Sequence, residues 1–171
     1  MNLNVIRKVL FVSLPAFLIV GCDSLPKGSP SLPAEHTYSK EDFLPVSIKF
    51  NGMTEISAGE TENTISITPH IDVYDAAGSR IKAPGIVRFE LFELIGRSQD
   101  SLGPRLKVWQ DFNLNTFETN NRYWSDPLRC YIFSLELDSN LVKPDTQYQF
   151  TAVFISGTNR FSDQKRIDFN K

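Results

Sequence analysis

Few residues in this sequence have the types and the spacing that metal binding or catalysis requires. The chain has 171 residues, and it contains two histidines and two cysteines. His70, Asp72 and Asp75 are close enough in sequence to outline a cation site, but no further well-spaced carboxylate or histidine completes the shell. The same spacing also fits a strand that ends in a tight turn. We therefore expect His70 to be a solvated surface residue and the chain to hold no metal.

The common catalytic signatures are also missing from the sequence. It contains no Gly-x-Ser-x-Gly motif, no Gly-x-x-x-x-Gly-Lys loop, no His-Glu-x-x-His motif and no Cys-x-x-Cys pair. A nucleophile needs a base, and His36 and His70 are the only histidines. Glu90 and Glu93 form a carboxylate pair, but a glycosidase needs two carboxylates across a cleft, which spacing along the chain does not establish. We expect a protein that is not an enzyme and has no cofactor.

Aromatic and polar side chains gather in one long connection, residues 113–127. Tyr123 and Trp124 lie there beside Arg122, and rings next to a guanidinium suit stacking on a sugar or peptide ligand. Trp109 is a further candidate for the same ligand. The alternative, which we favour, is that the two loop rings pack back onto the domain as a plug.

Cys130 is the second residue with chemical potential. It shares its strand parity with Leu128 and Ile132, opposite Tyr131, so we expect it outside the core or under a loop. The simpler interpretation is a small half-buried residue. The alternative is a reactive or intermolecular thiol, which would need a more basic surrounding than Arg129 alone supplies.

The first residues have the layout of a signal peptide. Arg7 and Lys8 precede an uncharged apolar run at residues 9–20, which is too short to cross a bilayer comfortably. The run ends in Ile19-Val20-Gly21-Cys22, which resembles the bacterial lipobox. That resemblance implies that Cys22 receives a diacylglycerol, that the chain is cut before it, and that the new N-terminus is acylated with a fatty acid such as palmitate. The alternative is a plain signal peptide or a single-pass anchor in which Cys22 is incidental.

Three segments follow from this assignment: a lipoprotein signal peptide at 1–21, a lipidated cysteine with a Ser/Pro-rich flexible tether at 22–41, and a domain at 42–171. Two or more acyl chains make a stable anchor where one would be marginal. We expect the protein in the bacterial cell envelope, anchored to a membrane and facing the periplasm. Asp23 resembles an inner-membrane retention signal of enteric bacteria, but the rule depends on lineage, so inner and outer membrane both stay open.

Charge and composition exclude other classes of protein. The chain has 18 Lys+Arg against 20 Asp+Glu, a net charge of −2. Removal of residues 1–21, which carry Arg7, Lys8 and no acid, changes the net charge to −4. An acidic chain of average composition gives no reason to expect nucleic acid as a partner, and it is neither disordered nor polytopic.

Period-2 patterns dominate the chain after about residue 42 and predict an all-β fold. In the predicted strand at residues 65–73, Pro69 removes a hydrogen-bond donor, so this strand lies at an edge or changes sheets there. The predicted strand at residues 86–94 loses its alternation at Phe92 and Leu94, which indicates a bulge. In the predicted strand at residues 105–112, the alternation places Leu106, Val108 and Phe112 on one face and Trp109 on the other. The predicted strand at residues 160–169 has a polar centre, and we expect it at the edge of a sheet. The seven predicted strands are residues 44–50, 65–73, 86–94, 105–112, 128–138, 148–155 and 160–169.

Seven strands at this spacing match a two-sheet Greek-key sandwich of the immunoglobulin type. The segment from Leu141 through Pro144 to Tyr148 resembles the tyrosine corner of fibronectin type III domains, in which a phenol binds upstream backbone. The resemblance implies an immunoglobulin/fibronectin III-like β-sandwich. The immunoglobulin disulfide is missing, because Cys130 is the one thiol left once Cys22 is lipidated.

These observations together predict a membrane-anchored lipoprotein that serves as a non-enzymatic binding or scaffold module. Its contacts are expected to be with an envelope protein, through an edge strand or an end loop. The alternative is a carbohydrate- or cell-wall-binding module that uses Tyr123, Trp124, Arg122 and Trp109.

Overall fold

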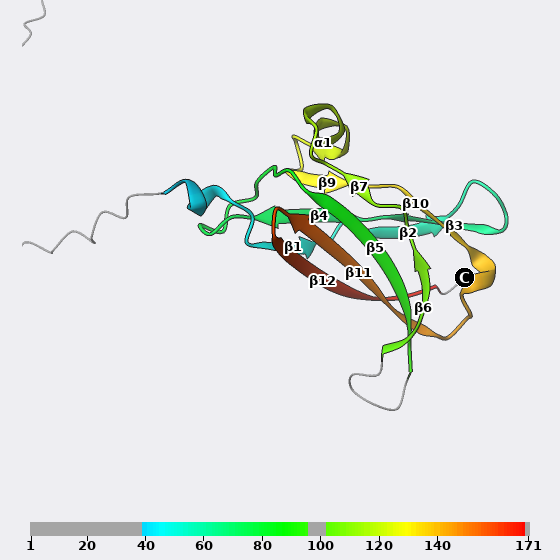
Figure 1. Cartoon of the computed structure of the whole chain (residues 1–171). Helices are drawn as coiled ribbons and strands as arrows, with labels where there is room; N and C mark the ends of the chain where they lie inside the picture. The colour runs from blue at the N-terminus through cyan, green and yellow to red at the C-terminus, as the bar shows by residue number, and fades with distance from the viewer. Residues whose placement is uncertain (1–38, 96–101, 170–171) are drawn as a thin grey trace, which may run out of the picture. The chain divides into compact units, whose positions relative to one another are not determined.

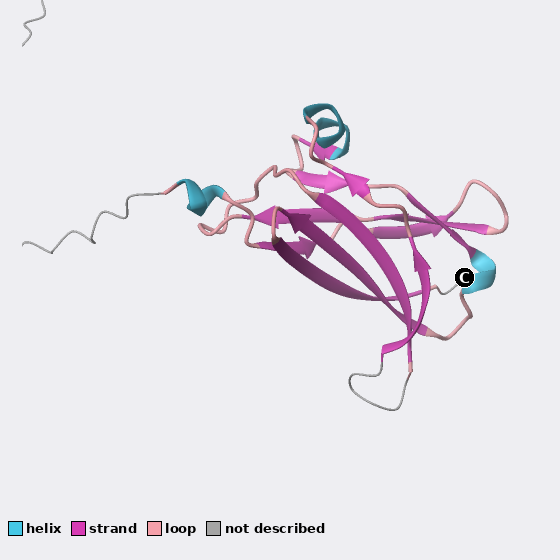
Figure 2. Ribbon diagram, in the orientation of Figure 1, coloured by secondary structure: helices cyan, strands magenta, loops and turns pink. Residues whose placement is uncertain are grey.

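Antiparallel strands build two layers in the computed structural model, which describes residues 39–95 and 102–169 (Figures 1 and 2). The described residues lie in one compact unit. The first layer is one sheet in the order β12-β11-β5-β6, and the two-residue β7 extends it beside the start of β5. Its strands are β5 (Ile86–Leu94), β6 (Leu102–Val108), β7 (Phe112–Asn113), β11 (Gln147–Ser156) and β12 (Asn159–Asp168).

The second layer consists of two shorter sheets, with orders β1-β4-β9-β8 and β2-β3-β10. Its strands are β1 (Ser47–Phe50), β2 (Glu55–Ala58), β3 (Thr64–Thr68), β4 (His70–Tyr74), β8 (Trp124–Ser125), β9 (Cys130–Ile132) and β10 (Leu135–Asp138). Three of the predicted strands, 65–73, 105–112 and 128–138, correspond to pairs of neighbouring strands, and the other four each correspond to one strand. The prediction of an all-β sandwich is confirmed.

Pro69 divides the second layer. The chain leaves one sheet at Thr68 and enters the other at His70, because proline has no N–H for the ladder. Backbone bonds bridge the break: Asn51 N donates to His70 O (2.8 Å) and Phe133 N donates to Pro69 O (3.1 Å). The predicted change of sheets at the proline is therefore confirmed.

The core lies between the layers and follows the predicted alternation. Phe89, Phe133 and Phe150 are fully buried, and Phe89 contacts the other two with ring centroids 5.1 and 5.6 Å apart. These rings come from β5, the β9–β10 connection and β11, so they join both layers. Burying such rings is the main favourable contribution to the folding of a small sandwich.

Two local predictions about the sheets are also confirmed. The β5–β6 register shifts on either side of Phe92, which is the expected irregularity. β12 lies at the end of its sheet, where Phe50 N of β1 donates to the Asp163 carboxylate (2.7 Å). The β11–β12 hairpin has a two-residue loop whose first residue, Gly157, has φ 59°, as a type II′ turn requires.

The single face predicted for Leu106, Val108 and Phe112 is wrong, because Leu106 and Phe112 pack against the core and Val108 does not. Trp109 N donates to Phe89 O and its side chain is 8% exposed, whereas Val108 pairs with the outward-facing Glu90 and is 40% exposed. Side chains of paired residues share a face, so the bulge in β6 moves the alternation by one residue. The strand β2 and the seven-residue helix α1 (Phe117–Tyr123) were not predicted, nor were the 3₁₀ turns η1 (Lys40–Phe43) and η2 (Ser139–Leu141).

Candidate functional site

The connection at residues 113–127 folds as α1 followed by β8, and not as an irregular loop. Thr116 caps the helix, with its hydroxyl accepting from Thr119 N (3.2 Å). Phe117 in the first turn is 84% exposed. Arg122 in the last turn pairs with Glu118 (3.3 Å) on the helix surface.

A buried hydrogen-bond network fastens this connection to the sandwich. Asn120 Nδ2 donates to Ala83 O (3.0 Å) and to Leu114 O (2.9 Å), and its Oδ1 accepts from the Tyr131 hydroxyl (3.0 Å). The same hydroxyl accepts from Ala83 N (2.8 Å). Burial raises the pKa of Tyr131 above its ordinary value. Within the described residues no buried side-chain polar atom lacks a partner, so the network is fully satisfied.

Two of the predicted ligand-stacking rings are packed into the domain. Tyr123 stacks on Phe133 (5.0 Å between centroids) and meets Phe112 edge-on (5.3 Å). Trp109 is buried, and its indole N–H donates to Glu136 O (2.8 Å). The structure therefore does not bring Trp109, Tyr123 and Arg122 together at one surface.

Trp124 occupies a different position, half-buried at the start of β8. Its ring meets Tyr131 edge-on (5.0 Å), its indole N–H donates to the Asp126 carboxylate (2.7 Å), and Lys82 Nζ lies 5.7 Å from its ring centroid. Lys82 also donates to the Asn121 side chain. A cation over an indole face is a favourable electrostatic contact.

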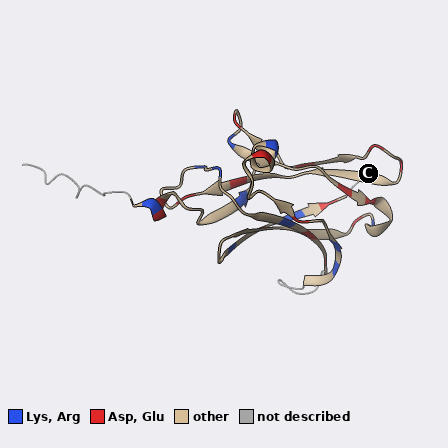
Figure 3. Cartoon of the chain, turned by 45° about the horizontal axis from the view of Figure 1, so that its top comes forward, with Lys and Arg blue, Asp and Glu red and all other residues tan. Residues whose placement is uncertain are grey.

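Trp124 forms one wall of a surface groove in which basic residues gather. Three cations line the groove, Arg80, Lys82 and Arg129, together with Asp126 and Phe43. Figure 3 shows blue Lys and Arg positions on the loops around α1. We call this site the basic groove. Sequence reasoning missed its cations, because they lie on two loops that only the pairing of β4 with β9 brings together.

The two guanidinium groups are held by backbone and not by groove carboxylates. Arg80 Nη1 donates to Leu128 O (3.4 Å), and Arg129 Nη2 donates to Arg80 O (2.9 Å). Arg80 Nε also pairs with Asp72 (3.2 Å) behind the groove. A hydrogen bond with Tyr74 and the charge of Asp72 raise the pKa of Arg80. Among residues 39–95 and 102–169, no ion pair joins Lys82 or Arg129 to a carboxylate.

The residues of the candidate cation site have structural partners. Asp72 is 3% exposed and accepts from Asn51 Nδ2 (3.1 Å) as well as from Arg80, and Asp75 accepts from Ser79 N (2.8 Å) in a turn. His70 is half-buried and not fully solvated, with Nδ1 3.2 Å from Thr68 O. No group of three His, Cys, Asp or Glu in the described part of the chain could hold a metal ion.

Other predicted residues have plain structural roles. Glu90 pairs with Arg105 (3.4 Å). The Tyr148 hydroxyl accepts from Lys143 N (2.7 Å) five residues upstream, the contact that a tyrosine corner implies. Leu141 at the end of η2 and Pro144 in the loop that follows are both exposed. Cys130 is fully buried, so its predicted half-exposure is wrong, and burial raises the pKa of its thiol.

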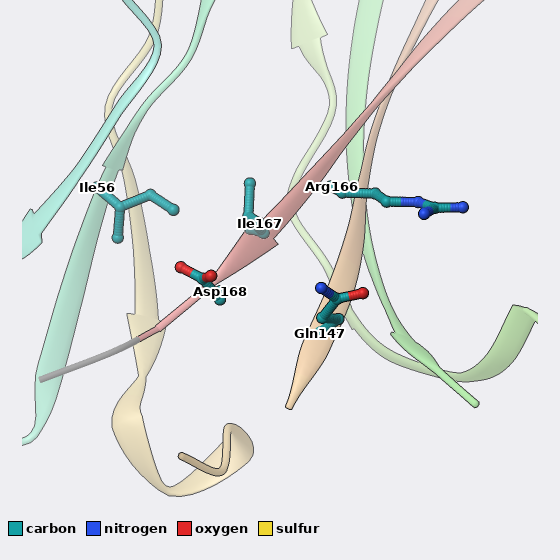
Figure 4. Close-up of a pocket in the computed structure, with 5 residues that line it drawn as sticks. All are labelled: Ile56, Gln147, Arg166, Ile167 and Asp168. Carbon is teal, nitrogen blue, oxygen red and sulfur yellow. The ribbon is translucent and has the colours of Figure 1, made fainter. Parts of the chain in front are cut away.

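A second hollow lies beside β2 and the end of β12. Figure 4 shows Ile56 pointing toward the strand that carries Ile167, while the Arg166 side chain extends away. Gln147 and Asp168 complete the lining. This opening has little convergent chemistry, so the basic groove is the better candidate site.

Cys22 and His36 lie outside the described residues. No helix in residues 39–95 or 102–169 is long and apolar enough to cross a membrane.

The domain is an all-β sandwich of two antiparallel layers. No protein-family model matches the chain, and a search of curated proteins finds no match. Among solved structures, the chain is similar to a Parabacteroides merdae β-glucuronidase with glycerol in its active site (TM-score 0.39, 12% identity). That match covers 72% of this chain and only 13% of the glucuronidase. It is also similar to the third fibronectin III domain of a human protein (TM-score 0.36, 10% identity), with 81% of this chain and 94% of that one covered.

Proposed function

We propose that this protein is a lipid-anchored lipoprotein of the bacterial cell envelope, whose β-sandwich is a non-enzymatic binding module facing the periplasm. The basic groove is its binding site. The observation that carries the proposal is the gathering of Arg80, Lys82 and Arg129 around Trp124 on a chain whose net charge is negative.

The anchor is supported by the sequence at Cys22. Two positive residues, a short apolar run, Gly21 and then a cysteine follow one another in the order that lipid modification requires. Lipidation would restrict the module to a membrane surface, where weak contacts are strengthened by high local concentration.

The groove is supported by its charge and by how its cations are held. Guanidinium groups that are fixed by backbone carbonyls lose little freedom when they bind an anion, since their positions are already set. An anionic ligand would therefore be favoured, such as an acidic segment of an envelope protein.

The carbohydrate alternative has weaker support. Stacking on sugar needs open aromatic faces, whereas Tyr123 and Trp109 are used in core packing and Lys82 lies over Trp124.

Two experiments test the two parts of the proposal. For the anchor, Cys22→Ala should leave an unlipidated and uncleaved precursor that incorporates no labelled palmitate. Normal processing of this variant would refute lipidation at Cys22.

For the groove, a photoreactive amino acid replaces Lys82 in cells, and a matched variant carries it at the exposed Lys143. We expect covalent adducts from position 82 that are lost on Arg129→Glu, and none from position 143. Equal labelling at both positions, or none at position 82, would refute the groove as the binding site.

A further inference from the structure

The basic groove lies at the end of the sandwich where the described chain begins. Phe43 of η1 lines it, only four residues after Ser39, the first described residue. Figure 1 shows η1 at this end, beyond β1 and β4, and η2 at the opposite end. The backbone fixes η1 there, because Ala76 N donates to Asp42 O (3.3 Å).

Apolar side chains extend from the same end of the domain. Phe43 is 59% exposed, Leu44 55% and Val46 46%, and Leu128 beside Arg129 is 37% exposed. Large exposed apolar residues beside cations are typical of surfaces that contact the lipid headgroup region, where rings and aliphatic chains enter the interface and cations meet phosphates. A surface for a soluble anion alone would not need them.

The charge of the groove complements an anionic bilayer. Three cations and one carboxylate, Asp126, line the groove; Asp126 is bonded to the Trp124 indole, and Arg80 is also paired with the buried Asp72. Each basic residue near an anionic membrane strengthens binding about fivefold. Lys82 and Arg129 have no ion pair among the described residues, so both charges remain available for phosphate oxygens.

The chain length allows this contact. The 16 residues from 23 to 38 separate Cys22 from Ser39, and a chain of that length spans at most about 60 Å. The end that carries η1 is therefore always within about 60 Å of a lipidated Cys22, and no partner has to be recruited for it to meet the bilayer.

We propose that the basic groove and the apolar residues around η1 form a docking surface for the anionic phospholipid bilayer that holds the anchor. This inference rests on the proposed function, and it names the lipid surface as the ligand of the groove. Docking orients the sandwich with η2 and the β2–β12 opening away from the membrane, where they are free to meet a protein partner.

The test uses the full lipid-anchored protein in two kinds of vesicle, pure phosphatidylcholine and phosphatidylcholine with 30% phosphatidylglycerol. Acrylamide, a neutral aqueous quencher, is titrated against tryptophan emission. Trp109 is buried in either case, so a change reports on Trp124. We expect quenching to fall at least twofold in the anionic vesicles and to recover in 0.5 M salt. Trp124→Phe should abolish the difference.

A matched pair of variants assigns the effect to the groove. Lys82→Glu with Arg129→Glu should restore full quenching in anionic vesicles. Lys143→Glu with Arg166→Glu, an equal charge change at exposed positions away from the groove, should leave the protection intact. Near-ultraviolet dichroism checks that each variant is folded.

Equal quenching in the two kinds of vesicle would overturn the proposal, as would loss of protection in the control pair. If a polyglutamate peptide protects Trp124 while anionic vesicles do not, the groove binds a protein ligand, which refutes membrane docking but leaves the proposed function in place. Failure of the protein to anchor in either vesicle would instead contradict the anchor on which both depend.

Discussion

The two tryptophans of this domain lie in different surroundings and serve different purposes. Trp109 is buried beside Phe150 (5.8 Å between centroids), and its indole N–H donates to Glu136 O of β10 in the other layer. Trp124 is half-buried, and its N–H donates to Asp126 in its own loop, with Lys82 over the ring. Trp109 thus joins the layers, whereas Trp124 positions charged groups at a surface. The two rings differ in the partner of the indole N–H: it is backbone of the opposite layer for the buried Trp109 and a surface carboxylate for Trp124.

Trp109→Ala should produce the largest loss of stability. Truncation removes a buried indole and leaves the Glu136 carbonyl without its donor, so we expect the free energy of unfolding to fall by about 3–5 kcal/mol. Urea unfolding followed by circular dichroism measures this change. A loss below about 1 kcal/mol would contradict a role for Trp109 in joining the layers.

Tyr131→Phe should have the next largest effect. The change keeps the ring but removes the hydroxyl that serves Ala83 and Asn120, leaving buried polar groups unsatisfied at a cost of about 1–3 kcal/mol. The raised pKa of Tyr131 adds a pH dependence, because the unfolded state ionises first as pH rises. The contribution of the Tyr131 hydroxyl to the free energy of unfolding is present below pH 10 and is lost as pH rises through the folded-state pKa. Unfolding by urea at pH 7 and pH 10.5 tests both, and a variant as stable as the wild type would refute the network.

Most of the fold could be predicted from the sequence, because its strands have one buried face. The alternation in β5 and β11, and Pro69 as the point where the chain changes sheets, depend on neighbouring residues only. Trp109 was misplaced because a bulge in β6 shifts the alternation, and the bulge is set by pairing with β5. The local sequence pattern therefore predicts which way a side chain points only as far as the next bulge in the strand.

The candidate site could be predicted only in part. Trp124 lies in a connection whose composition is unusual, so it was found. The cations were not, because Arg80 follows β4 and Arg129 precedes β9, and nothing in the sequence states that these strands are neighbours. Cys130 was misjudged for a similar reason. Its strand has two covered faces at that point, since Asp72 in the adjacent strand is buried as well.

Trp124→Ala should affect binding more than stability, unlike Trp109→Ala. The ring is already partly exposed, so we expect a loss of only about 1–2 kcal/mol in the free energy of unfolding. Protection by anionic vesicles, monitored through a fluorophore on Lys40, should nevertheless be lost. If the variant is as destabilised as Trp109→Ala, Trp124 is a core residue and the contrast between the two fails.

Arg129→Gly should have the smallest effect on stability and the opposite sign. Arg129 has φ 52°, a left-handed conformation that costs a non-glycine residue about 1–2 kcal/mol, and glycine adopts it without that strain. Loss of the bond from Arg129 Nη2 to Arg80 O offsets part of the gain, so we expect stability to be unchanged or to rise by up to about 1 kcal/mol. Asp145→Gly at φ 55°, in the loop before β11 and away from the groove, is the matched control. Both variants should be at least as stable as the wild type by urea unfolding, but only Arg129→Gly should weaken docking to anionic vesicles. A strained arginine that is retained at a cost to stability is explained by binding, whereas a clear loss of stability on Arg129→Gly would make its side chain structural and remove it from the site.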